Sequence, residues 1–284
     1  MLTRYAPSPT GHLHLGHVVN AIYVWGLARA AGGRVLLRME DHDRIRCRPE
    51  YEASILDDLA WLGFVPDAGL HPLLRQSGRD EVYRDALERL RRSHHVYACA
   101  CSRKHIAGER YDGFCRDRAL EDGPGRTLRI RFDERVERFE DRFLGVVEQV
   151  PASQCGDLLL RDRDGHWTYQ FTVTVDDLVQ GITDVIRGMD LAASTGRQLQ
   201  LRRMLGAPDP PRFAHHPLVL KPNGEKLSKS AGDTGVRELR HAGLTPADVI
   251  GRAAGAVGLI HEPRPVSARD VGQLFYGSRT ENRT

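Results

Sequence analysis

The chain has 284 residues, a hydrophobic fraction of 40% and a formal net charge of +3, which suit a folded protein and permit, without requiring, a nucleic-acid partner. No apolar run approaches the roughly 20 residues of a transmembrane helix, and the charged, turn-rich N-terminus does not have the pattern of a signal peptide, so we expect a cytoplasmic protein with no membrane partner. The five cysteines, an odd number, favour reduced thiols or a metal site over a disulfide framework.

The first seventeen residues combine a strand, a polar turn and the start of a helix. Residues 2–6 predict a short strand, which ends because Pro7 and Pro9 cannot continue a ladder. Histidines at positions 12, 14 and 17 then lead into a helical pattern of apolar residues. The first N–H groups of a helix are unpaired and face anions, and imidazoles there can donate to phosphate oxygens. The stretch predicts a phosphate-binding turn; the alternative is a polar loop with scattered histidines.

The next elements complete a βαβ unit. The helix is expected to end at Gly32-Gly33, and residues 34–39 predict a strand that enters the acidic cluster Glu40-Asp41-His42-Asp43. Such a unit implies a parallel sheet whose ligand crevice lies at the carboxyl ends of the strands. Because Ser8 and Glu40 both lie at such ends, we expect them to line one pocket.

Beyond this unit the pattern changes twice. Helices are predicted over 49–63 and 79–92, and a strand over 96–99. Cysteines, β-like runs over 128–132 and 143–150, and a hairpin signal at Asp164-Gly165 then indicate an inserted subdomain. The α/β pattern returns with a strand over 182–188, a helix over 196–205, a strand over 217–221 and helical sequence beyond 233.

These elements predict an α/β fold, a Rossmann-like parallel sheet with one insertion. We expect four segments: 1–98 and 171–232 as two halves of the core, 99–170 as the inserted subdomain, and 233–284 as a short helical C-terminal segment.

The lysines are concentrated in one loop. Only four occur in the chain, and three of them, Lys221, Lys226 and Lys229, lie within nine residues. The stretch Lys226-Leu-Ser-Lys-Ser230 lies between Gly224 and Gly232 and offers flexible point charges and hydroxyls. Such a loop suits a polyphosphate, especially when negative charge develops at phosphorus. The alternative is a solvated basic hairpin.

Three cysteines predict a metal site. Cys99, Cys101 and Cys115 offer three thiolates, and a tetrahedral zinc site requires one more ligand. Local candidates for the fourth ligand are His105, Tyr111 and, at longer reach, His95, and spacing alone favours His105. The alternative is a set of three buried free thiols.

Two distant motifs together resemble the paired signatures of class I aminoacyl-tRNA synthetases: His14-Leu-Gly-His17 after the first strand and Lys226-Leu-Ser-Lys-Ser230 near the last. The stretches Arg4-Tyr-Ala-Pro-Ser-Pro-Thr-Gly11 and Arg38-Met-Glu-Asp41 resemble the glutamyl branch of that class. Only 54 residues (284 − 230) follow Ser230, too few for the helical anticodon-binding region of glutamyl-tRNA synthetases. The chain therefore resembles the family of glutamyl-Q tRNA(Asp) synthetases, and no anticodon-binding domain is expected.

The resemblance implies an enzyme that activates L-glutamate with ATP and Mg²⁺ as glutamyl-adenylate. It would transfer the glutamate to the queuosine base in the anticodon of tRNA(Asp), as a monomer with one structural Zn²⁺. Two alternatives stay open: a truncated glutamyl-tRNA synthetase that charges a tRNA 3′ end, and a non-catalytic paralogue that binds RNA or protein.

The resemblance also assigns residues. It implies a catalytic role for His14, His17, Lys226 and Lys229, and ATP binding by His14, Gly16, His17 and Lys229. The implied glutamate-binding residues are Arg4, Tyr5, Ala6, Pro7, Ser8, Glu40, Tyr169 and Arg187. The implied zinc ligands are Cys99, Cys101, Tyr111 and Cys115. Among the glutamate-binding residues, we expect Glu40 to bind the ammonium group and Arg4 or Arg187 the side-chain carboxylate.

Overall fold

The computed structural model describes residues 1–102, 106, 110–207, 209–219 and 235–276, which form two compact units. The first unit comprises Met1–Arg75, Thr183–Asp190 and the chain from Ala214 onward, and the second comprises Gln76–Ile182 and Leu191–Phe213. Among the described residues, no helix is both long and apolar enough to cross a membrane.

The first unit is built on parallel strands. β1 (Leu2–Tyr5) pairs in parallel with β2 (Arg34–Leu37), with Leu2 opposite Arg34. β8 (Asp184–Gly188) lies beside β1, where the Thr183 N–H donates to the Leu2 carbonyl at 2.9 Å. The end of β9 (Arg212–His216) lies next to β8. This arrangement confirms the predicted α/β fold with a parallel sheet.

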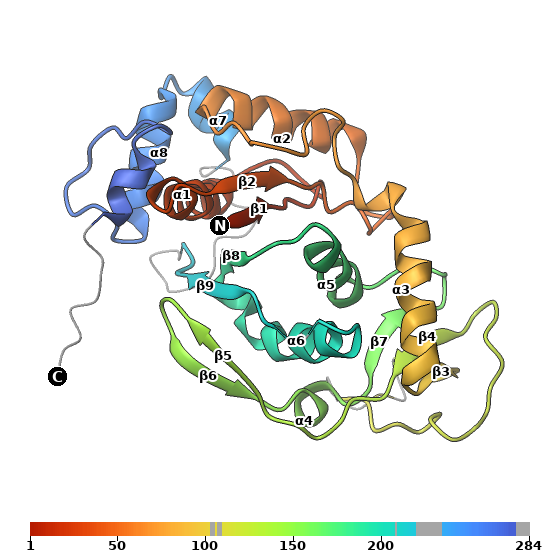
Figure 1. Ribbon diagram of the computed structural model, residues 1–284. Helices are drawn as coiled ribbons and strands as arrows, with labels where there is room; N and C mark the ends of the chain where they lie inside the picture. The colour runs from red at the N-terminus through yellow and green to blue at the C-terminus, as the bar shows by residue number, and fades with distance from the viewer. Residues whose placement is uncertain (103–105, 107–109, 208, 220–234, 277–284) are drawn as a thin grey trace. The chain divides into compact units, whose positions relative to one another are not determined.

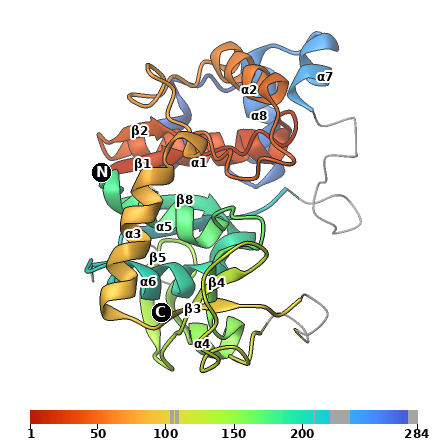
Figure 2. The same ribbon diagram turned by 90° about the vertical axis from the view of Figure 1, so that its right-hand side faces the viewer.

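Helices cover these strands in the first unit. α1 (Leu15–Ala30) packs against β1, β2 and β8, and its far side contacts α8 (Pro246–Ala256) and the short helix η5 (Val271–Phe275) (Figures 1 and 2). α1 buries residues around most of its circumference, because it lies between the sheet and these C-terminal elements. α2 (Pro49–Leu62) and α7 (Val236–His241) complete the unit.

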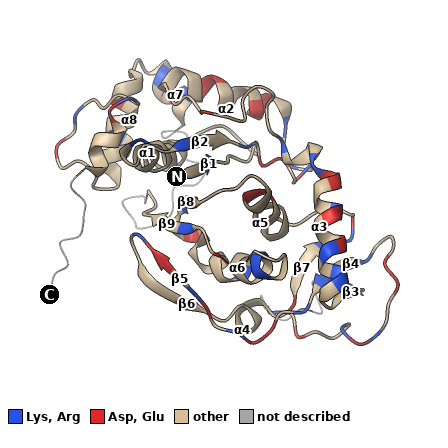
Figure 3. Cartoon of the chain, viewed as in Figure 1, with Lys and Arg blue, Asp and Glu red and all other residues tan. Residues whose placement is uncertain are grey.

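The second unit contains an antiparallel sheet in the order β3-β4-β7, made by β3 (Val96–Cys99), β4 (Thr127–Ile130) and β7 (Leu158–Arg161). α3 (Asp80–Ser93) and α5 (Tyr169–Val179) pack together. They are joined through the buried Asp176 carboxylate, which accepts from Gln76 (2.8 Å), Arg79 (2.7 Å) and Tyr83 (2.9 Å). Figure 3 shows acidic residues at the start of α3 and basic residues at its end, the distribution that its helix dipole favours.

The other elements of the second unit are short. They are the hairpin β5 (Glu137–Asp141) and β6 (Gly145–Gln149), the helices α4 (Pro151–Cys155) and α6 (Thr195–Met204), and the 3₁₀ helix η1 (Gln76–Gly78). A second 3₁₀ helix, η3 (Met189–Ser194), crosses the boundary between the units in sequence.

One predicted strand is wrong in its described part. The sequence favoured a strand over 217–221, but β9 ends at His216, residues 217–219 form no strand, and 220–221 lie outside the described residues. Pro217 has no N–H to donate to a ladder, and the Pro217 carbonyl lies 2.9 Å from His216 Nδ1 instead. The strand Arg-Phe-Ala-His-His was missed because its polar residues hide the alternation.

Candidate functional site

The carboxyl ends of β1 and β2 meet as the sequence predicted. The Glu40 N–H donates to the Pro7 carbonyl at 2.9 Å, which places the turn after β1 against the residues after β2. Glu40 is 6% exposed, and its Oε1 accepts from Arg38 Nη2 at 2.9 Å. Arg38, which is fully buried, therefore orients the Glu40 carboxylate. From the sequence, Arg38 was noted only as part of the motif Arg38-Met-Glu-Asp41, and this orienting role was not predicted.

Two arginines lie near the same strand ends. Arg4 Nη1 donates to the Ile186 carbonyl at 3.3 Å, so the side chain extends from β1 toward β8. Arg187, on β8, donates from Nε to His215 Nε2 at 3.0 Å, and each arginine is 4% exposed. His215 must accept at Nε2 and so carries its proton on Nδ1. We call Arg4, Glu40 and Arg187 the strand-end cluster.

The other predicted glutamate-binding residues differ in position. Tyr5 is buried, packs on Trp25 with ring centroids 5.1 Å apart, and donates to the His17 carbonyl at 3.3 Å. Burial raises the pKa of its hydroxyl above the usual range. Ala6 and Ser8 are half-buried and Pro7 is buried in the turn after β1. Tyr169 is half-buried at the start of α5 and belongs to the second unit, whereas the strand-end cluster belongs to the first.

His14 and His17 cap the start of α1. His14 Nδ1 accepts from the Gly16 N–H at 3.1 Å, and His17 Nδ1 accepts from the His14 N–H at 3.1 Å. The helix therefore begins at Leu15, earlier than the predicted start after His17. Because each Nδ1 is an acceptor, each neutral ring carries its proton on Nε2, from which it can donate to an anion. Gly16 is required here, since a Cβ would lie 2.9 Å from His14 Cε1.

His12 belongs to a different set of contacts. Its Nδ1 lies 2.8 Å from Ser54 Oγ, its ring stands edge-on to Tyr51, and its Nε2 lies 3.4 Å from Arg237 Nη1. It therefore links the turn after β1 to α2 and α7. The three histidines looked equivalent in the sequence, but His12 links three segments whereas His14 and His17 together cap α1.

The lysine loop, with Lys226 and Lys229, lies outside the described residues. The first described residue after it, Gly235, forms an antiparallel bridge with His14, and the Val236 N–H donates to the Leu13 carbonyl at 2.9 Å. α7 then packs on α2 through Arg240, which pairs with Asp57 at 2.9 Å. The chain that leaves the lysine loop is thus fixed against the start of α1.

Asp58 predicts a pH-dependent stability. It is 1% exposed on α2, and neither carboxylate oxygen has a hydrogen-bond partner among the described residues. Burial, with repulsion from Asp57, raises its pKa from 3.8 to about 6 despite Arg237 and Arg240 nearby. The folded state therefore binds this proton more tightly than the unfolded state, so the contribution of Asp58 to stability is greatest below about pH 4 and is lost as the pH rises through about 6.

We expect Asp58→Asn to be more stable than the parent at pH 7.5, by about 2 kcal/mol, because a shift of roughly two pKa units corresponds to about 3 kcal/mol and the amide finds no better partners. The difference should close below pH 4. Thermal unfolding at both pH values measures it, with the exposed Asp85→Asn on α3 as the control. An equal difference at both pH values would assign the effect to packing instead.

The three predicted cysteines form a cluster in the second unit. Their sulfur atoms all lie within 4.8 Å of one another, and Cys101 Sγ is 3.6 Å from Cys115 Sγ. The Tyr111 hydroxyl lies 3.3 Å from Cys99 Sγ and 3.8 Å from Cys101 Sγ, and it accepts from the Cys115 N–H at 2.9 Å. Among the described residues, no histidine joins the three sulfurs, and His105 lies outside that part of the chain.

The surroundings of Tyr111 hold it in this cluster. Its N–H donates to the Cys155 carbonyl at 2.9 Å, and the Arg129 guanidinium lies 3.9 Å from its ring centroid. Gly156 has a φ of +66°, and a Cβ there would lie 1.7 Å from the Tyr111 carbonyl oxygen. Burial opposes ionisation of Cys115, but donors led by the Ala100 N–H lower the pKa of this thiol to about 7. Three thiols at these separations can supply three of the four donors of a tetrahedral metal site, and the phenol oxygen lies beside them.

Comparison with known proteins shows what the chain is similar to over most of its length. Residues 1–250 match the family model of the class I tRNA synthetases (E and Q), catalytic domain. A glutamyl-Q tRNA(Asp) synthetase from Symbiobacterium thermophilum is 39% identical over 96% of this chain and 91% of its own length. The corresponding protein from Burkholderia cenocepacia is 42% identical over 98% and 94%.

A solved structure gives the same result for the fold. A glutamate tRNA ligase from Elizabethkingia meningosepticum, crystallised with its amino acid, is 28% identical with a TM-score of 0.81 over 96% of this chain. The chain spans 64% of the length of that ligase.

Proposed function

The chain belongs to the class I tRNA synthetases of the E and Q type, within the family of glutamyl-Q tRNA(Asp) synthetases, and from this membership we propose its reaction. It activates L-glutamate with ATP as glutamyl-adenylate and transfers the glutamate to the queuosine base in the anticodon of tRNA(Asp). The observation that carries the proposal is the first unit's pairing of a buried, charged strand-end cluster with the His-capped start of α1. Tyr5 of β1 donates to the His17 carbonyl, and Gly235, the first described residue after the lysine loop, forms a bridge with His14.

The strand-end cluster has the charges that glutamate requires. The amino acid has two carboxylates, which pair well with guanidinium groups, and one ammonium group, which requires an anionic partner. Glu40, oriented by Arg38, would bind the ammonium group, and Arg4 and Arg187 would face the carboxylates.

In the first step, the α-carboxylate oxygen of glutamate attacks the α-phosphorus of ATP. A new C–O–P linkage forms, the bond to the β-phosphate bridging oxygen breaks, and pyrophosphate leaves with that electron pair. The Nε2–H groups of His14 and His17 would donate to phosphate oxygens at the start of α1. Lys226 and Lys229 would stabilise the developing charge, and Mg²⁺ bound to ATP would help to neutralise the polyphosphate.

In the second step, a hydroxyl of the queuosine attacks the acyl carbon of the adenylate. The ester forms, AMP leaves, and the hydroxyl proton passes to the departing phosphate. The protein's contribution is to hold the two reactants in line while the strand-end cluster keeps the glutamyl group in place.

The cysteine cluster fits a structural zinc ion. Cys99, Cys101, Cys115 and Tyr111 would hold it, since sulfurs about 2.3 Å from a tetrahedral metal lie about 3.8 Å apart and the Cys101–Cys115 sulfurs are 3.6 Å apart. The cluster lies in the second unit, away in sequence from the residues assigned to the reaction, so its proposed role is to stabilise that unit.

The decisive experiment locates labelled glutamate on the RNA. We expect label in the anticodon of queuosine-containing tRNA(Asp), no label on tRNA(Asp) without queuosine, and glutamate-dependent ATP–pyrophosphate exchange without RNA. Label on the 3′ adenosine would favour a glutamyl-tRNA synthetase. That alternative has less support, because the similar glutamate tRNA ligase is only 28% identical. Absence of exchange would favour a non-catalytic paralogue.

A further inference from the structure

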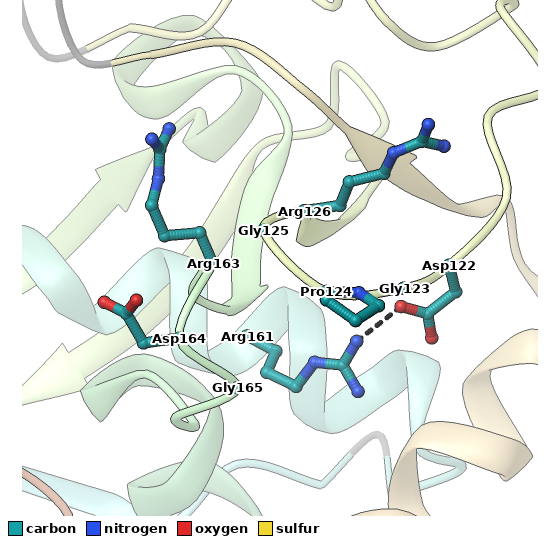
Figure 4. Close-up of a pocket in the computed structure, with 9 residues that line it drawn as sticks. All are labelled: Asp122, Gly123, Pro124, Gly125, Arg126, Arg161, Arg163, Asp164 and Gly165. Carbon is teal, nitrogen blue, oxygen red and sulfur yellow. Dashed lines mark hydrogen bonds and ion pairs between the residues drawn. The ribbon is translucent and has the colours of Figure 1, made fainter.

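The second unit contains a cavity of about 530 Å³ that the reaction does not use. Figure 4 shows its walls, the loop that precedes β4 and the turn that follows β7. Apart from charged side chains, the lining consists of glycines and one proline: Gly123, Pro124, Gly125 and Gly165. A site whose only apolar side chain is one proline ring offers little to a base or a lipid tail, whereas the glycine backbone allows a bulky polar group to approach closely.

The charged lining is dominated by arginine. The wall contains three arginines and two aspartates, which gives it a net charge of +1 (three minus two): Arg126, Arg161, Arg163, Asp122 and Asp164. The Asp122 carboxylate is already shared, because Arg161 pairs with one oxygen and Arg91 with the other, at 2.7 Å. Arg161 is therefore a structural part of the wall.

Arg126 and Arg163 are the cations that remain for a ligand. Arg126 Nη1 donates to the Glu121 carbonyl at 2.7 Å, and Arg163 Nη2 donates to the Cys101 carbonyl at 3.2 Å. In the part of the chain that the structure describes, neither side chain forms an ion pair, and both guanidinium groups keep further N–H donors. A contact with a carbonyl orients an arginine without neutralising its charge. Both guanidinium groups are therefore available to donate to an anion.

We propose that this arginine pocket binds a backbone phosphate of the RNA that receives the glutamate, a proposal that rests on the proposed function. Phosphodiesters supply the geometry that guanidinium groups prefer, and phosphate contacts position an RNA without reading its sequence. Because the Cys101 carbonyl holds Arg163, the cysteine cluster also fixes one side of the pocket.

The test compares two charge-matched double variants. Arg126→Gln with Arg163→Gln removes the two cations of the pocket, and Arg135→Gln with Arg138→Gln removes two exposed arginines near β5. RNA binding is measured directly, with tRNA(Asp) and increasing KCl, and transfer is measured at low RNA concentration. For the pocket variant we expect about 10-fold weaker binding and a salt slope reduced by about 0.7 to 0.9, the change that accompanies the loss of one phosphate contact. The loss should appear in KM for RNA, with ATP–pyrophosphate exchange unchanged.

Each contrary outcome has its own meaning. An unchanged salt slope in the pocket variant, or an equal loss in the control variant, would overturn the proposal. A change confined to inhibition by inorganic phosphate, with RNA binding intact, would also overturn it by making the pocket a site for free anions. Failure of the parent enzyme in exchange would instead count against the proposed function, because the binding measurement needs no catalysis.

Discussion

Glu40→Gln is expected to reduce kcat/KM for glutamate in ATP–pyrophosphate exchange by about 30-fold to several thousand-fold. Removing one member of a buried, hydrogen-bonded charge pair costs about 2–5 kcal/mol, and each 1.4 kcal/mol is a factor of ten. The variant loses the proposed partner of the glutamate ammonium and leaves the fully buried Arg38 without the carboxylate that accepts from it. The KM for ATP should stay within about threefold, because Glu40 is not assigned to ATP.

A substrate analogue separates ligand binding from local support. 2-Hydroxyglutarate has a hydroxyl where glutamate has its ammonium group, so the parent enzyme should strongly prefer glutamate. In Glu40→Gln this preference should shrink, because the charge that recognises the ammonium is gone. The exposed Glu50→Gln on α2 is the matched control. A folded Glu40→Gln enzyme that keeps the parental preference would show that Glu40 serves only Arg38.

Local patterns predicted most of the elements that position the site. As expected, α2 begins at Pro49 and ends just before Gly63, since proline suits the first helical turn and Gly63 adopts a φ of +84°. The same reasoning missed α5 and β7. The helix α5 is buried on several sides, and its buried residues include the polar Thr172, Thr174 and Asp176. Its sequence therefore lacks the single apolar face by which a helix is recognised. The four-segment division into domains stays a prediction.

The site was predictable where its chemistry follows chain order. Strand ends gather in a parallel sheet, which is why the turn after β1 lies against Glu40, whose N–H donates to the Pro7 carbonyl. The pocket that Ser8 and Glu40 would line stays a prediction. The supporting contacts join residues far apart in sequence and have no local signal. Arg187 and His215 are the clearest example, because nothing in the pattern around either residue indicates the other. Roles assigned to Lys226 and Lys229 stay predictions.

Removal of the proposed zinc is expected to destabilise the second unit. Cys101→Ser should lower the metal content from about one zinc per chain to nearly none, because two thiolates and a phenolate do not complete a tetrahedral site. Metal binding of this kind contributes directly to folding. We expect the first thermal transition to fall by about 10 °C or more. In a unit of this size each 1 kcal/mol of lost stability lowers the melting temperature by about 4 °C, so a loss of about 3 kcal/mol is sufficient. Cys47→Ser, in the first unit, should retain both zinc and stability.

The fourth ligand can be identified separately. The Tyr111 hydroxyl lies 3.3 Å from Cys99 Sγ, so Tyr111→Phe should lose zinc to a chelator about 10- to 100-fold more readily than the parent. His105→Ala should lose it no faster. With cobalt in place of zinc, the sulfur-to-metal absorption should persist in Tyr111→Phe while the ligand-field bands shift. If His105→Ala were the sensitive variant instead, the fourth ligand would be His105, which spacing alone favoured. If Cys101→Ser kept its zinc, the proposed metal site would be wrong.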